Sequence, residues 1–184
     1  MNKSIVLSVL LACLVPCLQA QSSGSDEGWP GTLKGGICIQ KTQKLYWENG
    51  FAFDYSCAKI LDNRVHFGAN YVTSRLGSAI GSNAIKQDNV LFSAAYHFRH
   101  QKRLQPFVRL NLGYFKADYE SELFDALPNS AFVKALDAGL SYEFKIPLTL
   151  QVCAGYNLSA GTGTTGPGTL FPVYYKMSIL YTLF

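Results

Sequence analysis

The chain has 184 residues, of which 48% are hydrophobic and 15% are charged, with a formal net charge of +4. This length fits one domain, and so mild a positive charge argues against a nucleic-acid partner. Three of the five cysteines follow residue 20, at Cys38, Cys57 and Cys153, without the paired spacing of a metal site. We therefore expect no cofactor and no metal site, and we interpret these cysteines as small residues packed on strands.

The first twenty residues have the composition of an export signal. Lys3 is the charged residue at its start, Ile5 to Leu18 form an apolar stretch, and Ala20 offers a cleavage point. A lipoprotein signal is the alternative, but one candidate cysteine would leave a very short apolar core and the other follows a proline. We expect residues 1–20 to be a signal peptide and residues 21–32, rich in Gly and Ser, to be a flexible periplasmic leader.

Residues 33–184 are predicted to form one domain of eight β-strands, because apolar and polar residues alternate with period 2 between turn-forming segments. The last strand shows the pattern, since one parity holds Val, Tyr, Met, Ile, Tyr and Leu while the other includes Lys, Ser and Thr. The predicted strands are Leu33 to Lys41, Phe51 to Leu61, Arg64 to Ser74, Val90 to Arg99, Phe107 to Ala117, Phe132 to Phe144, Leu148 to Ser159 and Pro172 to Phe184.

The predicted connections alternate in length. Short turns are expected at Leu61 to Arg64, His100 to Pro106 and Lys145 to Pro147. Long loops are expected at Thr42 to Gly50, Arg75 to Asn89, Asp118 to Ala131 and Ala160 to Phe171. Short turns on one rim and long loops on the other are typical of transmembrane β-barrels. Because the strand number is even, both ends of the domain fall on the short-turn rim, which we expect to face the periplasm.

The two faces of each strand indicate which solvent surrounds the barrel. From Leu148 to Ser159, Leu, Val, Ala and Tyr share one face, whereas Thr, Gln, Cys, Gly and Asn share the other. A soluble ligand-binding barrel of the lipocalin or avidin type is the alternative, but it would turn its apolar face inward and its charges outward. Because Phe and Tyr crowd the apolar face, lipid is its expected surroundings, with Phe92, Leu140 and Leu150 pointing outward.

Aromatic residues of the predicted outer face form two bands, which match the interfacial girdles of membrane barrels. The band near the long loops is Phe51, Phe53, Tyr71, Phe92, Tyr114, Phe132 and Tyr156. The band near the short turns is Tyr96, Phe98, Tyr142, Phe144 and Tyr181. Lys59, Lys116 and Lys134 interrupt the apolar face, each near a predicted strand end where its ammonium can reach the interface.

With these features the chain resembles the small eight-stranded outer-membrane β-barrels of the OmpA-like and OmpX-like group. The resemblance is one of architecture and covers nearly the whole chain after the signal. It implies an integral outer-membrane protein of a Gram-negative bacterium, in contact with outer-membrane lipids and lipopolysaccharide. The family's terminal strand ends in Phe, with alternate residues facing lipid. Phe184 fits, but Thr182, Ser178 and Lys176 share its parity, which indicates either a bulge or a different assembly signal.

The polar faces of the strands predict a cluster of ionisable side chains inside the barrel. An eight-stranded barrel has room only for side chains, so we expect a hydrogen-bonded ionic plug and not a pore. The predicted members are Arg64, His66, His97, Arg99, Arg109, Glu143 and Asp137. The predicted neighbours are His66 with His97, Arg64 with Arg99, His97 with Arg109 and, higher in the barrel, Asp54 with Lys176 and Asp137 with Arg109.

An enzyme acting on lipid A or phospholipid is the alternative function, because histidine beside a carboxylate is the usual pair for proton transfer. Lipid A deacylases and palmitoyltransferases act at the outer leaflet, whereas this cluster is predicted near the short turns. The deacylase pattern of His, Ser and Asn on one strand is missing, since an aromatic and two basic residues follow His97. Ser93 and Ser141 are the candidate nucleophiles, and we assign no catalytic residue.

The long loops contain no specific binding motif. The loop Asp118 to Ala131 contains four carboxylates without calcium-loop spacing, so weak cation binding is the lesser interpretation. The tract Ala160 to Thr169 is rich in Gly and Thr but lacks the lysine of a phosphate loop. We therefore expect a membrane scaffold, or a surface adhesion or interaction protein that binds any ligand through its four long loops.

Overall fold

The computed structural model describes residues 31–42, 47–57, 59–77, 83–119, 128–159 and 171–183. These residues form eight strands and one 3₁₀ turn: β1 Gly31–Thr42, β2 Trp47–Cys57, η1 Leu61–Asn63, β3 Val65–Gly77, β4 Asn83–His97, β5 Leu104–Tyr119, β6 Ser130–Glu143, β7 Leu148–Asn157 and β8 Val173–Thr182. No helix in these ranges is long and apolar enough to cross a membrane. The predicted signal peptide lies outside the described residues.

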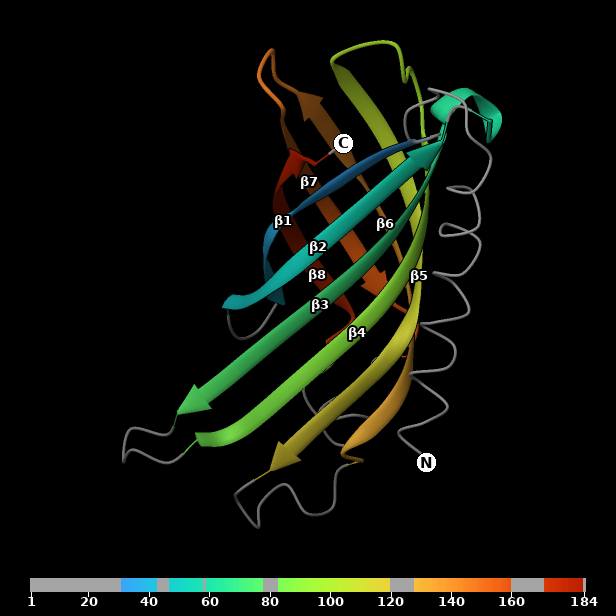
Figure 1. The fold of residues 1–184 in the computed structure, drawn as a ribbon. Helices are drawn as coiled ribbons and strands as arrows, with labels where there is room; N and C mark the ends of the chain where they lie inside the picture. Colours follow the sequence, from blue (N-terminus) through green and yellow to red (C-terminus); the bar gives the residue numbers. More distant parts are fainter. Residues whose placement is uncertain are drawn as a thin grey trace, which may run out of the picture.

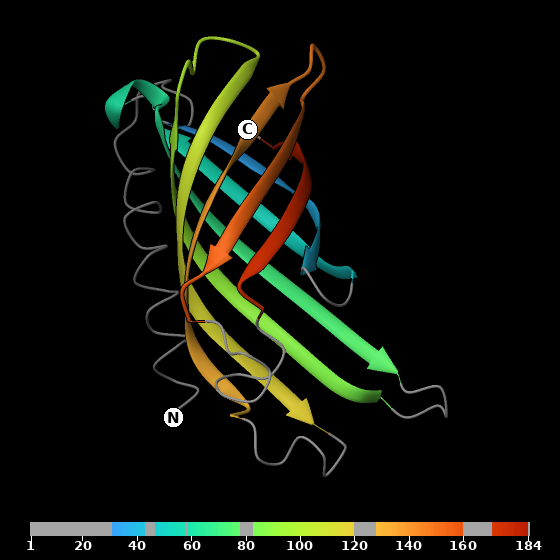
Figure 2. The same cartoon turned by 180° about the vertical axis from the view of Figure 1, so that it is seen from behind.

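Each strand pairs antiparallel with the next in sequence, and β8 pairs with β1 to close the barrel (Figure 1; Figure 2). The predicted all-β fold, an eight-stranded antiparallel up-and-down barrel, is confirmed. At the closing seam Ile37 lies opposite Ile179. The register of β8 runs without a shift from Val173 to Thr182, so these residues contain no bulge, and Phe184 lies outside the described residues.

The strands extend further at the loop end than the sequence indicated. β2 begins at Trp47, β3 runs to Gly77 and β4 begins at Asn83, so most of two predicted loops is β-ladder. The predicted contrast between short turns and long loops was therefore wrong for the first two loops, and it holds only for the connections 120–129 and 158–172. Figure 1 shows β3, β4, β5 and β6 reaching beyond β1, β2, β7 and β8 at this end.

The apolar face of every strand points outward. Phe92 and Leu140 are about half exposed, and Leu150 lies on the same outer face. The outer face also exposes the large residues Ile37, Phe51, Phe53, Phe67, Val108, Leu110, Leu112, Leu136, Val152, Met177 and Ile179. A soluble barrel would bury these side chains, because an exposed apolar surface of this size is unfavourable in water. The exterior therefore matches the acyl chains of a bilayer and excludes the soluble alternative.

Both predicted aromatic bands lie on the outer face. At the turn end, Tyr96 packs edge-on against Phe98 with ring centroids 5.1 Å apart, and Tyr142 packs in the same way against Phe144 at 4.9 Å. Rings of this kind are favoured where the acyl chains meet the headgroups. The two bands therefore indicate the upper and lower limits of the lipid-facing surface.

The three outer lysines do not share one environment. Lys134 lies on β6 with its Nζ 6.0 Å from the Phe132 ring, which places its ammonium at the aromatic band as expected. Lys116 lies beyond Tyr114 on β5, on the part of the strand that projects past this band. Lys59 was wrongly predicted on a strand, because β2 ends at Cys57 and Lys59 lies in the turn.

Two apolar clusters occupy part of the interior. One contains Leu91, Phe115, Ala117 and Val133, and the other contains Cys38, Ala52, Val72 and Leu180. Inward-facing glycines make room for large side chains: a Cβ on Gly155 would lie 2.3 Å from Cζ of Tyr174. The rest of the interior is polar, and its side chains form the candidate site.

Candidate functional site

The centre of the barrel contains an ion pair with several supporting hydrogen bonds. Arg109 on β5 donates from Nε to both carboxylate oxygens of Asp137 on β6, at 3.0 and 3.2 Å. Asn111 Nδ2 and Tyr174 Oη donate to the same carboxylate at 2.8 and 3.0 Å. Both charged side chains are buried, so their pairing compensates for the loss of water around each.

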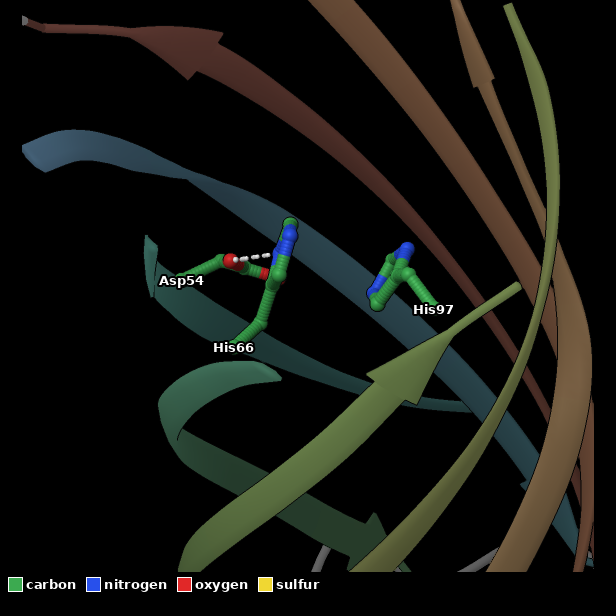
Figure 3. A group of neighbouring side chains, drawn as sticks. All are labelled: Asp54, His66 and His97. Atoms are coloured by element: carbon green, nitrogen blue, oxygen red, sulfur yellow. Dashed lines mark hydrogen bonds and ion pairs between the residues drawn. The ribbon is translucent and has the colours of Figure 1, made fainter. Parts of the chain in front are cut away.

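A second cluster lies closer to the turn end and contains two histidines. Asp54 on β2 faces His66 on β3, with Oδ1 and Nδ1 2.8 Å apart. The His66 ring stacks on the His97 ring from β4, with centroids 3.9 Å apart (Figure 3). Gln151 Nε2 donates to the other oxygen of Asp54 at 3.1 Å, and Arg109 Nη1 lies 3.4 Å from the oxygen of Gln151. One chain of contacts therefore connects the histidines with the central ion pair.

Two smaller clusters lie toward the loop end. Glu48 on β2 accepts hydrogen bonds from the side-chain amides of Gln40 and Gln87. Lys176 on β8 donates to Asn70 Oδ1 on β3 at 3.3 Å. All of these side chains are buried. Near the loop end, therefore, the polar groups of the interior also form hydrogen bonds with one another.

The turn end of the barrel contains an ion pair beside a cavity. Lys34 Nζ on β1 lies 2.5 Å from Glu143 Oε1 on β6. A cavity of about 400 Å³ is lined by these two residues, by His66 and Gln105, and by turn residues that include Gln101. Because Gln101 is exposed, the cavity connects the part of the interior around His66 with solvent at the turn end.

The structure places four of the seven predicted site residues together inside the barrel: His66, His97, Arg109 and Asp137. Glu143 is half-buried and pairs with Lys34, not with a histidine. Arg64 and Arg99 are exposed, so their predicted place in the interior was wrong. The physical reason is that β3 begins at Val65 and β4 ends at His97, so both arginines belong to turns.

The two turn arginines have different surroundings. Arg64 Nη1 lies 3.4 Å from Tyr96 Oη, and this hydrogen bond raises the pKa of Arg64. Arg99 has a φ of 54°, which turns the chain away from the β4 ladder directly after the strand. Arg64 and Arg99 therefore contribute positive charge to the rim of the barrel and not to its core.

The predicted neighbours were partly right. Asp137 pairs with Arg109 as expected. Asp54 pairs with His66 and Gln151, so its predicted contact with Lys176 was wrong. The ladder pairs His66 with Ala95 and His97 with Phe107, so neither predicted pair lies directly opposite. The two histidine rings still stack, because they meet diagonally across the ladder.

The partner of Asp54 was predicted wrongly, although the sequence contained a signal for the correct one. The available signal was parity: Asp54 and His66 both lie on the polar face of adjacent strands and near the same turn, and Ser56 lies opposite His66. Gln151 was missed because it contacts Asp54 across the barrel, between residues 97 positions apart in the chain.

The arrangement does not favour the catalytic alternative. Among the described residues, the side-chain contacts of His97 are with His66, Gln105 and Phe107, and neither Ser93 nor Ser141 is one of them. Cys38 and Cys153 are buried thiols, and Arg109 Nη2 lies 3.1 Å from Cys153 Sγ. The predicted acidic and Gly/Thr loop segments fall largely on residues 120–127 and 160–170, outside the described part of the chain.

A closed barrel with an apolar exterior, two aromatic bands and a side-chain-filled interior defines a class of protein. It is a transmembrane β-barrel with the fold of the small barrels found in bacterial outer membranes.

Comparisons with known proteins agree with this class. No protein-family model and no curated protein sequence matches the chain. Among solved structures, the N-terminal β-barrel domain of Pseudomonas aeruginosa OprF is similar with a TM-score of 0.59 and 13% identity, over 85% of this chain and 100% of that chain. Outer membrane protein H of P. aeruginosa has a TM-score of 0.55 and 12% identity, over 83% and 99%. Neisserial surface protein A has a TM-score of 0.52 and 18% identity, over 86% and 100%. These likenesses show the shared fold of small eight-stranded outer-membrane β-barrels.

Proposed function

We propose that this barrel acts as a non-conducting support that presents its loop end as an interaction surface outside the cell. Its outer face contacts the acyl chains of membrane lipids and lipopolysaccharide, and its turn end faces the periplasm. Any surface ligand would be bound at the loop end, by segments 42–50, 75–89, 118–131 and 160–171. This role needs no cofactor and no catalytic residue.

The observation that carries the proposal is the change of the outer face along β3, β4 and β5. Below the loop-end aromatic band, the outward residues are apolar, as at Phe67 on β3 and Leu110 on β5. Above it they are polar: Thr73 on β3, Asp88 on β4 and Lys116 on β5. Lipid cannot surround such residues favourably, so the ladder continues past the membrane into water.

Hydrogen bonds on the outer face support this projecting ladder. Asp88 Oδ1 accepts from Tyr71 Oη at 2.8 Å and from Thr73 Oγ1 at 2.7 Å. From Tyr114 to Tyr119 at its end, β5 extends roughly 17 Å further at about 3.3 Å per residue. A ladder of this length gives the loop end a rigid base, and binding residues are more precisely placed on rigid elements than on loops alone.

The filled interior supports a non-conducting role. The buried ion pair of Arg109 and Asp137 lies at the centre, and the apolar cluster around Phe115 lies toward the loop end. A barrel of eight strands has an interior just wide enough for its own side chains. We therefore infer that ions do not pass through it.

Cysteine labelling on intact cells tests the orientation on which the proposal depends. A single cysteine at Lys116 should react with a membrane-impermeant maleimide on intact cells, whereas a single cysteine at Lys102 should react only after the outer membrane is opened. Both side chains are exposed in the folded barrel, so a difference in labelling reports the side of the membrane on which each residue lies. The opposite labelling pattern would place the projecting ladder in the periplasm and contradict the proposal.

Adhesion assays test the interaction surface. Cells that display the barrel should adhere to an array of immobilised glycans and matrix proteins more strongly than cells without it. Replacing Lys86, Asp88 and Lys116 by Ser should remove this difference, whereas replacing the turn-end residues Lys102 and Lys145 by Ser should not. Equal adhesion of cells with and without the barrel would leave only the scaffold role.

A further inference from the structure

Three potential metal ligands converge near the turn end, from three consecutive strands. Asp54 on β2, His66 on β3 and His97 on β4 are all buried, and one ligand atom of each lies within 4.8 Å of the others. Figure 3 shows the Asp54 carboxylate against one side of the His66 ring and the His97 ring on another side. Two imidazoles with one carboxylate suit Zn²⁺ and related divalent transition metals better than Ca²⁺ or Mg²⁺, which prefer oxygen ligands.

The other contacts of the two rings leave suitable nitrogen atoms for a metal. His66 Nε2 lies 3.1 Å from the carbonyl oxygen of Asn63, which can only accept, so Nε2 carries a hydrogen. His97 Nδ1 lies 3.1 Å from Gln105 Oε1, and Gln105 Nε2 donates to the carbonyl of His100, which fixes the amide orientation. Nδ1 of His97 therefore also carries a hydrogen. Metal-binding histidines typically donate their second nitrogen in this way.

The charge balance of the interior also favours a cation here. Glu143 has Lys34 as its partner, and Asp137 has Arg109. The side-chain partners of Asp54 are His66 and Gln151, neither of which is a permanent cation. A buried carboxylate needs a counter-charge, which here is either a proton on His66 or a bound metal ion.

We propose that Asp54, His66 and His97 bind one divalent transition-metal ion, with Zn²⁺ as the best-suited ion, through Asp54 Oδ1, His66 Nδ1 and His97 Nε2. The ion takes the place of the proton shared by Asp54 and His66. The His97 ring tilts out of its stack on His66, because the lone pairs of two parallel rings do not point to a common position. Three protein ligands leave one tetrahedral position for a water molecule.

The site has an entry route and a structural consequence. His66 lines the cavity of about 400 Å³ that connects with solvent at the turn end, so an ion can reach it from the periplasmic side. The three ligands come from β2, β3 and β4, so a bound ion would join these strands inside the barrel. Metal binding would then stabilise the folded barrel, since the unfolded chain lacks the assembled site.

Zinc titration of the folded barrel tests the proposal. The full chain is purified without a polyhistidine tag, treated with a chelator, and titrated with Zn²⁺ by calorimetry in detergent. We expect one Zn²⁺ per barrel, and the variants His66→Ala, His97→Ala and Asp54→Ala should each weaken binding by at least about tenfold. His100→Ala is the matched control, because His100 is the third histidine of the chain and lies in the adjacent turn.

Two further measurements keep the test decisive if a variant folds poorly. The variants His66→Gln and His97→Gln keep a hydrogen-bonding group, and folding of each is checked by heat-modifiable gel mobility before titration. X-ray absorption at the zinc edge should show nitrogen and oxygen ligands without sulfur, which separates this site from the cysteines. Unchanged zinc affinity in both folded Gln variants, a sulfur ligand, or absence of saturable binding in the wild type would overturn the proposal.

Discussion

Replacing Asp137 by Asn removes the charge at the centre of the interior while keeping the size of the side chain. Asp137 is fully buried and accepts from Arg109, Asn111 and Tyr174. The substitution leaves the guanidinium of Arg109 buried without its counter-charge. Breaking a buried pair from one side lowers the free energy of unfolding by about 3–5 kcal/mol, which is a large fraction of the total stability of most domains.

The free energy of unfolding can be measured by urea titration of the barrel in lipid vesicles, followed by tryptophan fluorescence and by heat-modifiable gel mobility. Glu143→Gln is the matched control, because it breaks an ion pair whose carboxylate side chain is 40% exposed. We expect it to lower the free energy of unfolding by about 1 kcal/mol or less, since solvent screens partly exposed pairs.

A double variant separates two effects: the loss of the ion pair, and the cost of leaving one charge buried without its partner. Arg109→Met combined with Asp137→Leu removes both charges, and we expect it to be more stable than Asp137→Asn alone, because no uncompensated ion remains. If Asp137→Asn and Glu143→Gln lower stability equally and by less than about 1 kcal/mol, water reaches the central pair. That result would refute the inference that side chains seal the barrel.

Three further predictions concern packing and the outer face. Leu136→Arg, near the middle of β6 on the lipid face, should lower the free energy of unfolding in vesicles by about 2–4 kcal/mol. Gly155→Ala should lower it by about 1–3 kcal/mol because its Cβ would meet the Tyr174 ring, whereas Gly35→Ala, which meets side-chain atoms at 3.3 Å, should change it little. With the other cysteines replaced by Ser, Cys153 should react with maleimide only after the barrel is unfolded, as mass spectrometry would show.

The strand number and the direction of the side chains could be predicted from the sequence because lipid imposes a strong constraint. Outward positions must be apolar through the membrane, so the period-2 pattern is continuous there, as from Leu148 to Asn157. The parity of Phe92, Leu140 and Leu150 followed directly. A slip of one residue would turn every side chain to the wrong face, so the pattern specifies the register.

The extent of the strands beyond the membrane could not be predicted in the same way. Residues 85–89 of β4 pair with β3 and β5, yet Gln87 and Asn89 on the inner face and Lys86 and Asp88 on the outer face are all polar. Without lipid on one side, the alternation of apolar and polar residues disappears, and the segment has the composition of a loop. The hydrogen-bonded ladder that holds it depends on its neighbours and not on its own pattern.

The interior contacts were predictable in composition but only partly in pairing, since of the predicted ion pairs Asp137 with Arg109 formed and Asp54 with Lys176 did not. The polar parity indicated that His66, His97, Arg109 and Asp137 lie inside, but each partner depends on how far neighbouring strands are staggered. Closing a barrel requires such a stagger. Residues at the same height along the barrel axis are therefore not the residues that lie opposite each other in the ladder. The pairing of Asp54 with His66 and Gln151 therefore became visible only in the closed structure.

The interior contacts also have a mechanical consequence that the backbone ladder alone cannot provide. Backbone hydrogen bonds join only neighbouring strands, so they leave the cross-section of a barrel free to flatten. Several interior contacts join strands that are not neighbours: Lys34 on β1 with Glu143 on β6, Gln151 on β7 with Asp54 on β2, and Lys176 on β8 with Asn70 on β3.

These contacts act at different heights along the axis and in different directions across it. Flattening the barrel across these contacts would separate the polar pairs, and the buried groups of Asp54 with Gln151 and of Lys176 with Asn70 would lose partners that no water replaces. The polar interior thus keeps the cross-section round, and a round, sealed barrel holds the projecting ends of β3, β4 and β5 in fixed positions. In the proposed function, the pairing of charges inside the barrel is in this way coupled to the surface presented at its loop end.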